Sequence, residues 1–184
     1  LGSSVIVFDD SVTKLRRLQN NINHRLSTST LQPKILLKSL KRADVVIAAL
    51  QIGNGRVPCV ITDDMVQNMK NGSVVIDVSI DQGGCFETSE VTSHNNPIFR
   101  KHNVVHYCVP NIASRVARTA SMSISNILTP ILLSIGEEGG VENAIIKYDY
   151  LRAGVYTFNN NLTNEIIGNH FRIPSIDLNL FMGS

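Results

Sequence analysis

The segment Val74–Thr88 constrains the fold of this chain more than any other. It begins with apolar residues from Val74 to Ile76 and ends in the polar sequence Asp81–Gly84, which holds an acid, an amide and two glycines. A nearly continuous apolar run is typical of a strand covered on both faces of a parallel sheet. Ligands bind such sheets just beyond the carboxyl ends of the strands. The segment therefore predicts a buried strand with a candidate site at its end.

Strands and helices alternate through the first part of the chain. Further strands are predicted at Ser4–Phe8, Arg25–Ser29, Asp44–Leu50 and Val104–Val109, and helices at Leu15–Ile22, from Pro33 to Leu40 and after an N-cap at Thr62. A glycine-rich turn is expected at 53–55. Repeated strand–helix–strand units imply a parallel sheet with right-handed crossovers.

The pattern changes after Pro110. Apolar residues at three-to-four spacing predict a long helix over Ala113–Gly136, kinked near Pro130. Shorter helices are expected at Val141–Leu151 and Leu162–Phe171, separated by a turn at 159–160 and followed by an extended tail. We expect residues 1–112 to form a partial nucleotide-binding domain, and residues 113–184 to form the long helix and a helical tail.

The composition fits a globular protein without extreme charge. Of the 184 residues, 43% are hydrophobic and 17% charged, and the net charge is +2, so neither disorder nor a nucleic-acid partner is indicated. We expect no membrane span, because no apolar run reaches about 18 residues. The cysteines Cys59, Cys85 and Cys108 lack metal-ligand spacing. They predict free thiols in the cytoplasm and no metal site.

Asp9 ends the first predicted strand. In dinucleotide-binding folds an acid at this kind of position accepts hydrogen bonds from the adenosine ribose hydroxyls, and it repels the 2′-phosphate of NADP. This interpretation favours NAD. Only eight residues precede Asp9, so the glycine fingerprint that comes before such an acid is not in the chain. The alternative is that Asp9 is a turn residue or a helix cap.

Asp81 and Asn111 each follow a predicted strand. A carboxylate walled by apolar strand ends can act as an acid or base, because its pKa is readily moved; the alternative is that Asp81 only shapes the turn with the two glycines. Asn111 could contact a ligand or cap the long helix. The five histidines show no ligand or triad spacing and are interpreted as structural or surface residues.

Three segments together resemble the alanine dehydrogenase family, which shares its fold with the NAD-binding alpha subunit of proton-translocating transhydrogenase. They are Val7–Asp9 with Lys14–Arg16 following, Asp77–Glu87, and Tyr107–Ile112. The segments Lys41–Ile47, Arg118–Ser121 and Leu162–Glu165 extend the similarity. The sequence Asp-Gln-Gly-Gly-Cys-Phe-Glu at 81–87 is the most specific part of this resemblance.

The resemblance implies reversible oxidative deamination of L-alanine to pyruvate and ammonia with NAD, in a homo-oligomer that is a hexamer in the family. It implies Asp81 as the catalytic aspartate, Asp9 as the ribose acid and Lys14 as an adenosine-side contact. Further cofactor contacts are implied at Leu50 and Gln51, at Val78, Ser79, Ile80 and Asp81 beside the nicotinamide, and at Val109, Asn111 and Ile112 near its ribose.

The chain also departs from the family pattern. Nothing in it matches the family's substrate-binding arginine, lysine and histidine, or the first strand and glycine-rich turn of the nucleotide-binding domain, and Glu90 stands where many members have a cofactor-contacting arginine. We therefore expect a Rossmann-like sheet lacking its first strand–helix unit, in a fragment that is inactive alone. The alternatives are a transhydrogenase-like NAD-binding subunit and a non-catalytic nucleotide-binding or assembly module.

Overall fold

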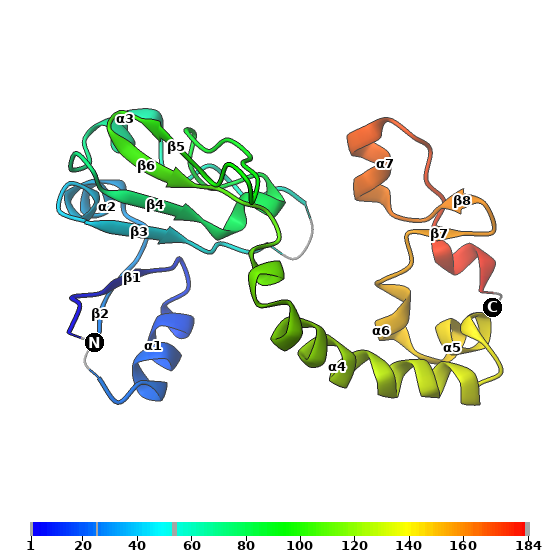
Figure 1. The fold of residues 1–184 in the computed structure, drawn as a ribbon. Coiled ribbons are helices and arrows are strands. Elements are labelled where there is room, and N and C mark those ends of the chain that lie inside the picture. The colour runs from blue at the N-terminus through cyan, green and yellow to red at the C-terminus, as the bar shows by residue number, and fades with distance from the viewer. Residues whose placement is uncertain (1, 25, 53–54, 183–184) are drawn as a thin grey trace. The chain divides into compact units, whose positions relative to one another are not determined.

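The computed structural model describes residues 2–24, 26–52 and 55–182, and the chain forms two compact units (Figure 1). Unit 1 comprises Leu1–Ile52 and Arg56–Pro110, and unit 2 comprises Gly53–Gly55 and Asn111–Ser184. The glycine-rich turn predicted at 53–55 falls largely outside the described residues. The predicted α/β class, with a parallel sheet and a long helix, is confirmed.

Unit 1 contains two groups of strands. β1 (Ile6–Phe8) pairs in parallel with β2 (Ser27–Ser29), and a separate sheet has the order β3-β4-β6-β5. In that sheet β3 (Val45–Ala48), β4 (Val74–Asp77) and β6 (Val104–Tyr107) run parallel (Figure 1). The three parallel strands were predicted, and their carboxyl ends meet at one edge of the sheet.

The edge strand β5 (Ile98–Lys101) runs antiparallel to β6 and was not predicted. The two strands form a hairpin whose loop residues, His102 and Asn103, have φ values of 51° and 59°. Two successive positive φ angles match the right-handed twist of a two-residue hairpin. The predicted parallel sheet therefore has one antiparallel strand at this edge, because a tight turn takes the place of a helical crossover.

Helices cover one face of the four-stranded sheet. α2 (Pro33–Leu40) and α3 (Asp63–Gln67) supply Leu36, Leu40 and Val66 to a core that also contains Ala48, Val75 and Val104 from the sheet. Pro33 occupies the first turn of α2, as predicted, and the Thr62 hydroxyl accepts a hydrogen bond from the Met65 amide at the start of α3. The predicted cap and helix starts are confirmed.

The opposite face of the same sheet is incompletely covered. Ile47 on β3 is 64% exposed, and Ile76 and Tyr107 on the neighbouring strands are only half-buried. In β1, Ile6 is also exposed. The prediction that β1 and β3 are buried on both faces is wrong for this unit, because no described helix lies over their outward side chains.

The helix α1 (Val12–Asn21) joins β1 to β2. The Ser11 hydroxyl caps it by accepting a hydrogen bond from the Lys14 amide, and Leu15 is its buried residue. The helix was predicted over Leu15–Ile22, so its start lies three residues earlier than expected. The short strand predicted at Arg25–Ser29 is confirmed over Ser27–Ser29 as β2, while Arg25 lies outside the described residues.

Unit 2 is mostly helical. It begins with the 3-10 turn η2 (Ile112–Val116) and α4 (Ala117–Glu137), which runs through Pro130. There follow α5 (Val141–Lys147), α6 (Asp149–Arg152), the hairpin β7 (Thr157–Phe158) with β8 (Asn161–Leu162), α7 (Glu165–Phe171) and the 3-10 turn η3 (Leu178–Phe181). The predicted turn at 159–160 joins β7 to β8, and both of its asparagines have positive φ. The prediction of an extended tail is wrong at Leu178–Phe181, where η3 forms.

The helix α4 has no buried residue in this chain. Its exposed apolar side chains include Ile124, Ile127 and Leu132. The stretch Ile112–Glu137 is long and apolar enough to cross a membrane by length and composition alone. This stretch was not anticipated from the sequence, and a single helix of this kind is weak evidence for a membrane protein.

Candidate functional site at the carboxyl ends of the parallel strands

The site begins where β4 turns into the 3-10 turn η1 (Val78–Gln82). Gly83 and Gly84 follow with φ values of 101° and 79°, a left-handed conformation that strains any residue with a Cβ atom. The Gly83 amide donates to the Ile80 carbonyl and the Gly84 amide to the Ser79 carbonyl, at 3.0 Å each. The two glycines therefore let the chain reverse tightly after η1.

Asp77, the last residue of β4, holds this reversal together. Its side chain is 1% exposed. One carboxylate oxygen accepts the Ser79 amide at 3.0 Å, and the other accepts the Cys85 amide at 2.9 Å and the Ser89 hydroxyl at 2.7 Å. A buried carboxylate needs such partners, since an unpaired one is costly. The carboxylate thus ties both ends of the glycine turn to the strand.

The turn is also tied to β3. The Ser79 hydroxyl donates to the Leu50 carbonyl at 2.8 Å, which joins the ends of two parallel strands. Two predicted cofactor-binding residues, Leu50 and Ser79, are thereby brought into direct contact. Gln51 follows Leu50 and is exposed, whereas Ile80 is buried and Val78 half-buried. Backbone and side chains at this edge are therefore available to an extended ligand.

Asp81 lies on η1 and is exposed. The expected wall of apolar strand ends around this carboxylate is not formed by unit 1, because the turn directs residue 81 outward while Asp77 points inward. An exposed carboxylate beside the strand ends can still meet a bound ligand. Asp81 therefore remains the candidate catalytic residue that the resemblance implies.

Asp9 and Lys14 come together at the carboxyl end of β1. One Asp9 oxygen accepts the Ser11 amide at 2.8 Å, which shapes the turn into α1, while Ser11 rather than Asp9 caps that helix. The other oxygen lies 4.0 Å from the Lys14 ammonium group. Asp9 therefore shapes the turn, as one of the two alternatives predicted, and its second oxygen forms a long ion pair with Lys14 at the strand end.

The end of β6 carries the remaining predicted contacts. Val109 is buried, and the preceding Cys108 thiol donates to the Ser89 hydroxyl at 3.7 Å, which links β6 to the Asp77 network. Asn111 and Ile112 belong to unit 2. Asn111 has a φ of 53° and stands at the N-cap position of η2 without a side-chain capping bond, and the long helix α4 starts from Val116, so the alternative that Asn111 caps the long helix is not supported.

A second buried polar pair lies behind the site. The Thr88 hydroxyl and His106 Nε2 are 2.8 Å apart, and His106 Nδ1 lies 3.1 Å from the Val104 carbonyl, which can only accept. Nδ1 therefore carries the proton and Nε2 accepts from Thr88. Burial is the main cause that lowers the pKa of His106, so the neutral ring is favoured. His106 also stacks on Phe99, which confirms its structural role.

The downstream end of the turn contacts the start of α3. The Glu87 carboxylate accepts the Asp63 amide at 2.7 Å, an arrangement favoured by the partial positive charge of a helix N-terminus. The Asp63 carboxylate in turn pairs with Lys101 at 3.2 Å and His102 at 2.7 Å. Hydrogen bonds from these two side chains lower the pKa of Asp63. The segment Asp77–Glu87, which carries the family resemblance, is therefore held by hydrogen bonds of Asp77 at one end and of Glu87 at the other.

Sequence reasoning missed the part played by Asp77, Ser89 and Thr88. The available signal was an acid at the end of an otherwise apolar strand, followed six and seven residues later by the consecutive glycines at 83–84. Such an acid needs nearby donors, but Ser89 is twelve residues away in sequence and could not be identified as a partner before folding. Glu90 is exposed at the rim of a shallow pocket with Thr92 and Phe99.

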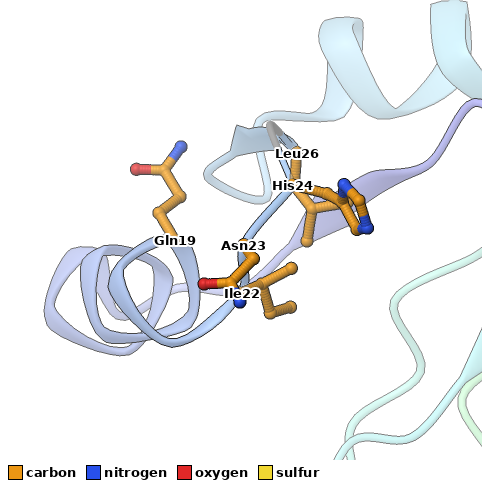
Figure 2. Close-up of a pocket in the computed structure, with 5 residues that line it drawn as sticks. All are labelled: Gln19, Ile22, Asn23, His24 and Leu26. Carbon is orange, nitrogen blue, oxygen red and sulfur yellow. The ribbon is translucent and has the colours of Figure 1, made fainter.

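The pocket in Figure 2 lies elsewhere in unit 1. It has a volume of about 440 Å³ and is lined by Gln19, Ile22, Asn23, His24 and Leu26, where α1 leads towards β2. None of the predicted site residues lines it. In the part of the chain that the structure describes, no group of three or more histidine, cysteine, aspartate or glutamate side chains could hold a metal ion.

Comparison with known proteins supports a specific class for this fold. Residues 1–165 match the family model described as "Alanine dehydrogenase/PNT, C-terminal domain". The alanine dehydrogenase of Bacillus subtilis is 37% identical over 168 residues, covering 91% of this chain and 44% of the relative. That of Halomonas elongata is 33% identical over 183 residues, covering 100% and 49%. The chain spans about half the length of the curated relatives it matches.

Solved structures agree with this result. An L-alanine dehydrogenase structure superposes with a TM-score of 0.84 at 30% identity, over 93% of this chain and 47% of the other. A transhydrogenase from Sinorhizobium meliloti superposes with a TM-score of 0.64 at 22% identity, over 73% and 38%, and shows likeness of fold alone. The chain is therefore a protein of the Rossmann-like α/β class. It belongs to the alanine dehydrogenase/PNT family, as the resemblance at Asp77–Glu87 implied.

Proposed function

We propose that this chain is the cofactor-binding portion of an NAD-dependent L-alanine dehydrogenase, an oxidoreductase that interconverts alanine with pyruvate and ammonia. The observation that carries this proposal is the placement of the family signature. Residues 77–87 leave the carboxyl end of β4, between the ends of β3 and β6, where parallel sheets bind ligands. The nicotinamide group would supply the hydride chemistry there.

The residues fit such a cofactor at two points. The Asp9 carboxylate is only partly buried and has one oxygen not used by the Ser11 amide, so it can accept from ribose hydroxyls. Lys14, Leu50, Gln51, Val78, Ser79 and Ile80 supply further contacts from the strand ends, with Val109, Asn111 and Ile112 completing the proposed set. The Asp9 charge favours NAD over NADP.

Asp81 is the proposed catalytic residue. Its carboxylate is exposed at the strand edge, where it can stabilise positive charge that develops on the substrate nitrogen and help position water. The groups that grip the substrate carboxylate are expected outside this chain. Glu90 stands at the position where many family members have a cofactor-contacting arginine, and its charge has the opposite sign.

The strand order supports the proposal that one strand–helix unit is contributed by further chain. In a Rossmann sheet the order is 3-2-1-4-5-6. Here β2, β1, β3, β4 and β6 match strands 3, 2, 4, 5 and 6 in turn. Strand 1 would lie between β1 and β3, which belong to two separate sheets in this chain. We therefore expect the 184-residue chain alone to be inactive.

The exposed α4 favours assembly as a second role. Its apolar side chains at 124, 127, 128 and 132 recur on one side of the helix and are all exposed. In the proposed enzyme they pack on the substrate domain or on another subunit of a homo-oligomer. A module with only this role, without catalysis, is the competing function. The three free cysteines fit a cytoplasmic protein.

The test is NADH oxidation by the protein extended upstream, with pyruvate and ammonium as co-substrates. We expect turnover by the extended protein, none by the 184-residue chain, and loss of turnover in Asp81→Asn of the extended protein. Hydride transfer from NADH to an NADP analogue without any pyruvate-dependent rate would instead identify a transhydrogenase-like subunit. Absence of both activities and of NADH binding would leave the assembly module.

A further inference from the structure

We propose that Asp77 is a positioning residue that sets the place of the Asp81 carboxylate and of the proposed nicotinamide-side backbone. This inference rests on the proposed function, and nothing in the family resemblance assigns a role to Asp77. The carboxylate is buried at the end of β4, four residues before Asp81. Its hydrogen bonds go to Ser79, Cys85 and Ser89, so it acts through the turn that it holds.

Only a carboxylate can accept all of the hydrogen bonds that are made at position 77. Its two oxygens accept two backbone amides and one hydroxyl, and the amides of Ser79 and Cys85 lie on opposite sides of Asp81. An ionised carboxylate is an acceptor at both oxygens, whereas an asparagine side chain places an NH₂ group against one of these amides. One backbone donor would then lose its partner, and the turn would open at that end.

A second contact gives an independent way to disturb the same carboxylate. A Cβ atom added at Gly84 would lie 2.8 Å from Asp77 Oδ2, closer than side chains are found. Gly72 has the same φ of 79°, but a Cβ added there meets no atom within 4 Å. The substitutions Gly84→Ala and Gly72→Ala therefore share the unfavourable φ and differ in the contacts of the added Cβ, which at Gly84 presses on Asp77 and also lies 3.1 Å from Ser89 Cβ and 3.3 Å from Ile80 Cδ1.

The first measurement is hydrogen exchange on the 184-residue chain, which needs no cofactor. We expect faster exchange of the amides from 79 to 85 in Asp77→Asn and in Gly84→Ala, and unchanged exchange there in Gly72→Ala. Unchanged protection in both Asp77→Asn and Gly84→Ala would overturn the proposal. Should Asp77→Asn fail to fold, the Gly84 and Gly72 pair decides the question.

The second measurement is steady-state kinetics on the extended protein. We expect kcat for reductive amination to fall about 10- to 100-fold in Asp77→Asn and Gly84→Ala, while KM for NADH stays within about threefold. Gly72→Ala keeps the parent kcat. A fall in kcat that only follows the folded fraction in all three variants would mean a merely structural Asp77. If the unmodified extended protein has no turnover, the proposed function fails while the exchange result still decides whether Asp77 holds the turn.

Discussion

The carboxyl end of β4 and the helix α4 are both built from apolar sequence, but the structure treats them in opposite ways. At the end of β4 the Asp77 carboxylate has three hydrogen-bond donors, and Phe86, in the segment that follows the glycine turn, is 3% exposed. Along α4 no residue is buried, and Leu132 is 64% exposed. The first region hydrogen-bonds its buried carboxylate within the chain, although the side-chain oxygen of Gln82 is buried without a partner, whereas the second leaves its apolar side chains exposed.

The two regions teach different things about function. A self-contained turn can hold a fixed geometry at a strand edge, which a cofactor-binding and catalytic site requires. An uncovered apolar helix contributes little to the stability of the chain, because it removes little surface from water. The comparison therefore predicts large effects for substitutions at the β4 end and small effects for matched substitutions on α4.

The largest expected effect concerns apolar side chains. Phe86→Ala removes a buried ring and should lower the free energy of unfolding by about 3–5 kcal/mol. Leu132→Ala removes an exposed side chain and should change it by less than about 0.5 kcal/mol. Urea unfolding of the two variants measures both values. A loss at Leu132 as large as that at Phe86 would show that α4 is already packed.

A matched pair of threonines gives the next effect. The Thr88 hydroxyl donates to buried His106, so Thr88→Val should cost about 1–3 kcal/mol by leaving an unpaired ring nitrogen. The Thr129 hydroxyl is 3.4 Å from Ser125 on exposed α4, where water can replace it. We expect Thr129→Val to change stability by less than about 0.5 kcal/mol in the same unfolding experiment. Equal costs would contradict the comparison.

The smallest effect is a pH dependence that belongs to the buried region. The native pKa of His106 is lowered from 6.5 by burial, so below pH 6.5 the unfolded chain binds a proton that the native chain does not. Stability due to the neutral ring is therefore present above pH 6.5 and is lost as pH falls from there through the native pKa. The urea midpoint of unfolding should therefore fall as the pH is lowered from about 7.5 to about 5.5.

His106→Gln is the variant that isolates this pH dependence. We expect the fall in urea midpoint below pH 6.5 to shrink in His106→Gln and to persist in His170→Gln, since His170 is exposed in unit 2. An unchanged pH dependence in His106→Gln would assign the effect to other groups.

Local sequence signals predicted much of unit 1. Proline at the first turn of α2, a capping threonine before α3 and the apolar run of β4 each act within a few residues. The hairpin of β5 with β6 was missed because its loop residues, His102 and Asn103, are not a strong turn signal. The exposure of Ile47 could not be predicted, since burial depends on elements that lie over the strand.

The candidate site was predicted as a segment, but its internal organisation was not. Periodicity and resemblance pointed to Asp81 and to the strand end around it, and Leu50 and Ser79 do lie in contact there. The exposure of Asp81 and the burial of Asp77 follow from which way each side chain points in a tight turn. That direction is set by the left-handed glycines and by Ser89, through contacts that only the folded chain brings together.

We propose that this chain is a cofactor-binding portion whose exposed apolar surfaces are covered by the rest of an alanine dehydrogenase. Hydrogen exchange compared between the 184-residue chain and the protein extended upstream tests it most directly. We expect the amides of β1, β3 and α4 to gain protection in the extended protein, while those of β4 and the turn at 79–85 stay equally protected. Unchanged exchange in β1, β3 and α4 would contradict it.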